Sequence, residues 1–146
     1  MFRRKTTITR PDRDRLMKVT RAKANRLRWA MFIDELRREL GGARIVEPNR
    51  ITRDIVTMDS TVRFFDLRND QREVYTLVYP EEADLSAGKL SVFSPLGTAL
   101  LGARAGDVVR VAGAAGPRAI KIEAIVHQPE AQVRSRAGSS TSQEMS

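Results

Sequence analysis

Few side chains of this sequence could form a catalytic or metal-binding site. The chain contains one histidine, His127, and no cysteine. It therefore cannot build a histidine–thiolate pair, a multi-histidine metal site or a cysteine-based zinc site. The glycine-rich residues 112–118 lack the GxxxxGK pattern, followed by Ser or Thr, of a phosphate-binding loop. We expect no catalytic residue, no cofactor and no metal site, and we expect that the protein is not an enzyme.

Arginine and lysine side chains are concentrated in the first third of the chain. Residues 1–44 contain 14 Lys/Arg and 5 Asp/Glu, a net charge of +9, whereas residues 45–146 contain 12 and 13, a net charge of −1. This asymmetry indicates an acidic partner, either nucleic acid or an acidic patch on a protein. A solvated helical face is the simpler alternative. The basic region lacks interleaved aromatic residues and a helix-turn-helix pattern, which weighs against nucleic acid.

Two helices are predicted to carry these cations. Thr9 and Pro11 are typical of a helix start, because a hydroxyl caps free N–H groups and proline fits the first turn. A break is predicted at residues 25–28, and a second helix follows until Gly41-Gly42 ends it. The apolar stripe of that helix has helical spacing and consists of Trp29, Phe32, Ile33, Leu36 and Leu40.

Consecutive helices bury their apolar stripes against each other, so we predict an antiparallel hairpin. Each helix would be only about 20 Å long at ~1.5 Å per residue. The hairpin tip contains Asn25, Arg26 and Arg28. The two arginines could meet acidic protein surface, nucleic acid or nucleotide phosphates, and solvated turn residues are the alternative.

From about residue 50 the apolar period changes from 3.6 to 2, which indicates β-strands. Strands are predicted at residues 55–58, 61–67, 73–79, 90–93, 108–111 and 119–126. Ser94 and Pro95 are predicted to start a short helix over residues 96–101, and Gly102 ends it. The predicted fold class is α+β, with a short N-terminal antiparallel helical hairpin followed by an antiparallel β-domain wrapped on one short helix.

This pattern divides the chain into a basic helical hairpin at residues 1–47, a β-domain at residues 48–130 and a polar tail at residues 131–146. The tail is rich in serine and poor in apolar residues, so we expect it to be disordered. The first residues are basic without a following apolar stretch, unlike a secretory signal. No apolar run approaches the ~20 residues of a membrane span. We expect a cytoplasmic protein without a membrane contact.

Three short motifs occur in a fixed order in the predicted β-domain. They are VTMDS at residues 56–60, LVYP at residues 77–80 and SPLGTALLG at residues 94–102, with Ala105-Gly106-Asp107 close behind. Together they resemble the C-terminal domain of the GreA/GreB transcription elongation factors, and they are even more similar to Rnk, the regulator of nucleoside diphosphate kinase, in the same family. The resemblance covers roughly residues 9–130.

The resemblance implies an FKBP-like β-domain that binds the rim of the RNA polymerase secondary channel, with the hairpin pointing into or over that channel. It also implies that Ser94, Pro95, Leu96 and Gly97 face the rim. A helix N-cap leaves free N–H groups and the positive end of the helix dipole at the surface, which suits the acceptor groups of a partner. An ordinary cap that serves only folding is the alternative.

In Gre factors, a pair of acidic residues at the hairpin tip helps to hold the second catalytic Mg²⁺ and provokes RNA cleavage by the polymerase. Residues 24–28 contain no acidic residue here. Mg²⁺ prefers carboxylate ligands, and two arginines would repel it. We therefore expect an RNA polymerase-binding transcription regulator of the Rnk type that does not stimulate transcript cleavage. A basic nucleic-acid-binding module is the first alternative, and an interaction domain with another protein partner is the second.

Overall fold

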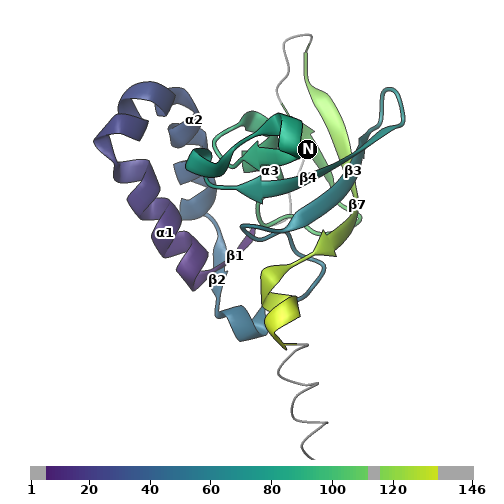
Figure 1. Cartoon of the computed structure of the whole chain (residues 1–146), viewed down its shortest axis with the longest axis horizontal. Helices are drawn as coiled ribbons and strands as arrows, with labels where there is room; N and C mark the ends of the chain where they lie inside the picture. The colour runs from purple at the N-terminus through teal and green to yellow at the C-terminus, as the bar shows by residue number, and fades with distance from the viewer. Residues whose placement is uncertain (1–5, 112–115, 135–146) are drawn as a thin grey trace, which may run out of the picture.

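The computed structural model describes residues 6–111 and 116–134. Figure 1 shows helices α1 (Arg10–Arg21) and α2 (Lys23–Gly41) as a pair beside a strongly curled sheet. The predicted α+β class with an N-terminal helical pair is therefore confirmed. In the described part of the chain, no helix is long and apolar enough to cross a membrane.

Helix α1 begins where the sequence predicts. Thr9 is its N-cap, and the Thr9 Oγ1 accepts a hydrogen bond from the backbone N–H of Asp12 at 3.3 Å. A short strand that the sequence did not indicate precedes the helix. This strand, β1 (Thr7–Thr9), pairs in parallel with β2 (Arg44–Val46), which follows α2. The two ends of the hairpin therefore lie side by side.

The hairpin turns earlier than predicted. Ala22 has an extended backbone (φ −59°, ψ 127°) between the two helices, whereas the predicted break at residues 25–28 is helical. A second irregularity occurs at Trp29 (φ −125°, ψ 24°), where α2 is kinked. Asn25, the first residue of the predicted break, lies in the first turn of α2, where asparagine is tolerated.

The main sheet has the strand order β5-β4-β3-β7-β6. Its strands lie close to the predicted runs and are β3 (Thr61–Asp66), β4 (Gln71–Val78), β5 (Lys89–Ser91), β6 (Val108–Val111) and β7 (Arg118–His127). Three strand pairs are antiparallel, but β4 and β5 are parallel, so the sheet is mixed. The chain between β4 and β5 passes through two 3₁₀ turns, η2 (Pro80–Glu82) and η3 (Leu85–Ala87), which allow it to return in the same direction.

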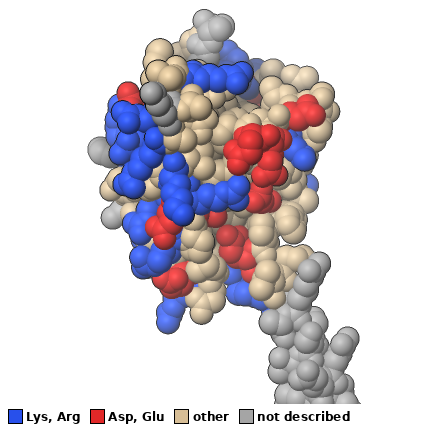
Figure 2. Space-filling view, turned by 60° about the vertical axis from the view of Figure 1, so that its left-hand side comes forward, with Lys and Arg blue, Asp and Glu red and all other residues tan. Residues whose placement is uncertain are grey.

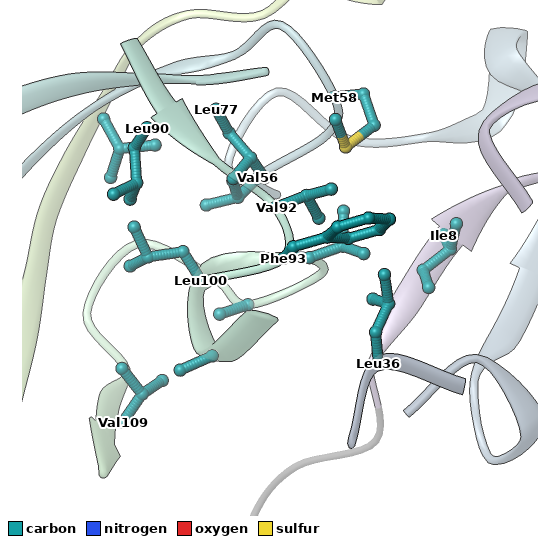
Figure 3. Close-up of a cluster of buried hydrophobic side chains, with 14 of the residues drawn as sticks. Ile8, Leu36, Val56, Met58, Leu77, Leu90, Val92, Phe93, Leu100 and Val109 are labelled. Atoms are coloured by element: carbon teal, nitrogen blue, oxygen red, sulfur yellow. The ribbon is translucent and has the colours of Figure 1, made fainter. Parts of the chain in front are cut away.

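One continuous apolar core joins the sheet, helix α3 (Pro95–Leu100) and the hairpin. Figure 3 shows Phe93 at the centre of this cluster, with Leu36 and Ile8 on the hairpin side and Leu100 on the other. Phe93 and Leu36 are 1% and 0% exposed. Burial on this scale is the main driving force for folding, so the hairpin is part of the same folded unit as the sheet.

The predicted strand at residues 55–58 does not form. Ile55 makes only an isolated bridge outside the sheet. The Val56 N–H donates to a backbone carbonyl just beyond α3 at 2.9 Å, and the Met58 N–H donates to the Asp12 Oδ2 of α1 at 3.1 Å. Backbone groups need one partner each when buried. The N–H groups of Val56 and Met58 therefore bind groups outside the sheet and are not paired with a neighbouring strand.

Residues 129–134 are helical, so residues 131–134 of the predicted tail are ordered. The Arg134 Nη1 donates to the backbone oxygen of Pro48 at 2.9 Å. Pro48 begins the 3₁₀ turn η1 (Pro48–Arg50), and this contact holds the C-terminal helix at the base of the molecule. The remainder of the predicted tail, residues 135–146, lies outside the described residues.

Candidate docking surface at helix α3 and the hairpin

The start of α3 is held by a serine cap, as predicted. The Ser94 Oγ accepts a hydrogen bond from the Gly97 N–H at 3.0 Å and donates one to the backbone oxygen of Ser91 at 2.6 Å. Pro95 follows in the first turn and is exposed, whereas Ser94 and Leu96 are half-buried. Of the predicted docking residues, Pro95 and parts of Ser94 and Leu96 therefore lie at the surface.

Gly97, the fourth predicted docking residue, is buried. A Cβ atom at this position would lie 2.1 Å from the backbone oxygen of Ser91 and 2.9 Å from the Cα of Val92. Gly102, which ends the helix, has φ +77°, and a Cβ there would lie 2.1 Å from the Thr6 side chain. The two glycines allow both ends of α3 to pack closely on neighbouring residues, so burial explains Gly97 without a partner contact.

Gly97→Ala is expected to destabilise the protein by at least about 2 kcal/mol, because the new methyl group overlaps backbone that cannot rotate away. Thermal unfolding followed by circular dichroism should show a melting temperature lower by roughly 4–8 °C. Gly41→Ala is the matched control, since a Cβ at Gly41 meets nothing within 4 Å. A melting temperature for Gly97→Ala equal to that of the control would contradict the close packing.

The predicted hairpin tip combines a structural residue with two exposed cations. The Asn25 Nδ2 donates to the backbone oxygen of Val19 at 3.0 Å, which ties the start of α2 to the end of α1. Arg26 and Arg28 are exposed, and within the described residues neither makes an ion pair. The guanidinium carbon of Arg28 lies 5.1 Å from the centre of the Trp29 ring. The two arginines are therefore available to an acidic partner.

Trp29 connects the tip to the start of α3. Its ring lies 6.4 Å from that of Phe93, the residue before Ser94, and 5.9 Å from that of Phe32. Tilted aromatic pairs at these distances are favourable contacts. The two predicted surfaces, at the tip and at α3, are thus linked through one aromatic cluster, which fixes their relative position.

A second contact between the hairpin and the β-domain, here called the joint, lies where α1 meets the VTMDS and LVYP motifs. The sequence did not indicate it. The Asp12 carboxylate accepts the Met58 N–H. The guanidinium carbon of Arg15 lies 3.7 Å from the centre of the buried Tyr79 ring, and the Arg15 Nη2 lies 3.4 Å from the Glu81 Oε1. Asp12 and Met58 are 46 residues apart, so no local pattern could reveal the contact.

Burial shifts the protonation of this joint. Desolvation raises the pKa of Asp12 to about 6, although the hydrogen bonds from the Met58 N–H and from Thr9 oppose the shift. Desolvation also raises the pKa of Asp59, with a further contribution from the nearby Glu82 carboxylate. Burial raises the pKa of the Tyr79 hydroxyl as well. The joint therefore holds acidic groups that take up protons more readily than exposed carboxylates do.

The pKa of Asp12 predicts a pH dependence of stability. The ordinary value is 3.8 and the folded value about 6, so protons bind preferentially to the folded state. The stability that Asp12 contributes is complete below the ordinary pKa and is lost as pH rises through the folded pKa. Asp12→Asn keeps an oxygen acceptor for the Met58 N–H but cannot titrate. Relative to wild type, this variant should gain stability as pH rises from about 4 to about 7.

Urea unfolding at a series of pH values measures this difference. Asp14→Asn, on the exposed side of the same helix, removes the same charge without touching Met58 and serves as the control. A constant difference in unfolding free energy between Asp12→Asn and wild type across this range would contradict the assignment.

Figure 2 shows Lys and Arg side chains gathered over the hairpin, with a group of Asp and Glu side chains beside them. Among the residues that the structure describes, no group of three or more histidine or acidic side chains is placed to hold a metal ion. His127 lies at the end of β7. The surface of the hairpin is thus mainly cationic, with a group of acidic side chains beside it.

Comparisons with known proteins agree with this description. The family model "Transcription elongation factor, GreA/GreB, C-term" matches residues 51–127. The regulator of nucleoside diphosphate kinase of Escherichia coli (strain K12) is 38% identical over 99 residues, covering 67% of this chain and 73% of that protein. The transcription elongation factor GreA of Acidiphilium cryptum (strain JF-5) is 34% identical over 93 residues, covering 64% of this chain and 59% of the factor.

A solved structure has a similar fold over most of this chain. The prokaryotic transcription elongation factor GreA/GreB from Nitrosomonas europaea superposes with a TM-score of 0.66 at 31% identity, covering 86% of this chain and 100% of that one. The resemblance that the motifs at residues 56–60, 77–80 and 94–102 indicated is thereby confirmed. On the match of its C-terminal domain, this chain belongs to the GreA/GreB family of transcription elongation factors.

Proposed function

We propose that this protein is a transcription regulator that binds RNA polymerase at the rim of its secondary channel and has no enzymatic activity of its own. Membership of the GreA/GreB family of transcription elongation factors supports the partner, and the similarity to a regulator of nucleoside diphosphate kinase supports a regulatory role of the Rnk type. One observation carries the proposal: in the largely buried motif at residues 94–102, Pro95 is exposed. Pro95 lines a groove together with the exposed side chains of Met31 and Phe32, and exposed apolar side chains that gather in this way are typical of a protein–protein interaction site.

The hairpin supports the second part of the proposal, which is that the protein does not stimulate transcript cleavage. Residues 16–33, which contain the end of α1, the turn at Ala22 and the start of α2, include no Asp or Glu. Mg²⁺ needs oxygen ligands, usually carboxylates. The exposed side chains of Arg26 and Arg28 at this end would repel a divalent cation. This end of the hairpin therefore lacks carboxylate ligands for a catalytic metal.

Capture of purified core RNA polymerase by the immobilised protein tests the first part. Binding should be retained at moderate salt, and a parallel titration against bare duplex DNA should show weak binding that falls steeply with salt. The reverse result, with tight DNA binding and no polymerase capture, would favour the nucleic-acid-binding alternative, for which the unpaired tip arginines provide the cations.

A protein acting on RNA polymerase would work in the cytoplasm of its cell.

A backtracked elongation complex tests the second part. Addition of the protein should leave the rate of RNA shortening at the level of the polymerase alone, and it should slow shortening by an added cleavage factor if both occupy the same rim. Faster RNA shortening on addition of this protein alone would overturn the proposal that it does not stimulate cleavage.

A further inference from the structure

A groove lies between α2 and the start of α3, beside Pro95. It has a volume of about 310 Å³, and its apolar lining includes Met31, Phe32, Phe93 and Ala99 as well as Pro95. Thr98 also lines the groove, but its Oγ1 already donates to the backbone oxygen of Val92 at 2.8 Å. The floor of the groove is therefore apolar and needs no polar partner.

One wall of this groove consists of exposed apolar side chains. Met31 is 84% exposed and Phe32 is 37% exposed. A single exposed apolar residue needs no explanation. Here, however, two large ones from the hairpin line a concave surface together with the exposed proline of the family motif. A concave apolar surface of this kind is typical of a site that receives a side chain of a partner.

The rim of the groove carries an unbalanced positive charge. Two of the lining residues are charged, Glu35 and Arg110. The Glu35 carboxylate is paired with Arg38 at 2.8 Å. Arg110 is exposed on β6 and lies opposite Ala119 of β7, and within the described residues it makes no ion pair. A carboxylate of a partner could therefore pair with the Arg110 guanidinium and balance its charge.

One aromatic ring connects the two sides of the groove. The Trp29 ring packs against both Phe32 of the hairpin wall and Phe93 of the domain wall, with ring centres 5.9 and 6.4 Å apart. A preformed groove loses little conformational freedom on binding, which increases affinity for a given contact area.

We propose that this groove receives a bulky apolar side chain of RNA polymerase that is flanked by a carboxylate, so that hairpin and β-domain hold one polymerase segment between them. The apolar side chain contacts Met31, Phe32 and Pro95, and the carboxylate pairs with Arg110. The inference rests on the proposed function, because the polymerase is the partner. It extends the docking surface from the α3 start onto the body of the hairpin.

Two single variants test the groove by the affinity for core RNA polymerase, measured by biolayer interferometry. Met31→Asp places a negative charge against the incoming carboxylate, and Arg110→Glu reverses the charge of the rim. Each is expected to weaken binding at least about tenfold, or ~1.4 kcal/mol. Leu85→Asp and Arg50→Glu are the matched controls, since both residues are exposed and lie outside the groove. Both controls should bind as wild type does.

The outcomes separate the two proposals. If Met31→Asp and Arg110→Glu bind polymerase as tightly as wild type does, the groove is not a docking site, although the proposed function stands. If wild type itself fails to bind core polymerase, the proposed function fails and the inference fails with it. Sedimentation of wild type identifies a different occupant: a dimer that Met31→Asp dissociates would assign the groove to a second copy of this chain and overturn the inference.

Discussion

Ser94→Ala combined with Pro95→Ala is expected to weaken capture of core RNA polymerase at least about tenfold. The proline ring is an exposed apolar part of the motif. The Ser94 Oγ forms hydrogen bonds with the Gly97 N–H and the Ser91 oxygen, which hold the turn that carries Pro95. Loss of one well-placed contact near the centre of an interface commonly costs 2 kcal/mol or more, by the order of magnitude seen in alanine scans. Titrated capture gives the dissociation constant.

Loss of the cap alone costs about 1 kcal/mol of stability, so circular dichroism should accompany the binding measurement and show a folded double variant. Pro48→Ala is a matched control, because Pro48 also occupies the first position of a helical turn, η1, outside the docking surface. If the double variant binds polymerase with the wild-type dissociation constant, the α3 start does not dock and its serine serves only folding.

Leu36→Ala is expected to lower the free energy of unfolding by about 2–5 kcal/mol, the range for truncation of a fully buried leucine. Leu36 is 0% exposed and lies on α2 in the core cluster that includes Phe93. Because that core is continuous, hairpin and sheet should unfold together in one transition, before and after the substitution. Urea unfolding followed by far-ultraviolet circular dichroism and by the fluorescence of the single tryptophan, Trp29, measures both quantities.

Leu27→Ala provides the comparison within the same helix. Leu27 is 78% exposed, so its truncation should change the unfolding free energy by less than about 0.5 kcal/mol. Two separate transitions, with Leu36→Ala shifting only that of the helices, would show that the hairpin is an independent unit.

Local signals predicted the starts of α1 and α3 and most strands correctly. Thr9 caps α1, and Ser94 caps α3, as their hydroxyls and the prolines after them indicated. Such caps depend on atoms within a few residues of one another, so the sequence contains all that is needed to recognise them. The change of apolar period near residue 50 likewise separated the helices from the sheet.

Tertiary contacts account for what the sequence did not predict. The β-rich run at residues 55–58 is not a strand, because Met58 donates to Asp12 on a distant helix. Strand β1 pairs in parallel with β2, a partner that only the closed hairpin brings within reach. The parallel pairing of β4 with β5 depends in the same way on turns whose direction no local pattern determines.

The candidate surface was predictable only in part. The motif at residues 94–102 indicated the α3 start, but the sequence could not show that Pro95 is exposed while Gly97 is buried. Met31 had no place in the predicted apolar stripe, and it lines the groove just after the kink at Trp29. The kinked residue, Trp29, packs on Phe93, a residue from another part of the chain.

The parallel pairing of β1 with β2 has a mechanical consequence. The strands join the two ends of the hairpin through the register Thr7–Arg44 to Thr9–Val46, and the Thr7 N–H donates to the Gly102 oxygen at 3.3 Å. Because both ends of the hairpin are held in this way, the hairpin should not pivot freely on the β-domain. A force on the tip of the hairpin is therefore transmitted to the β-domain. The fold itself sets the angle at which the hairpin meets a large partner.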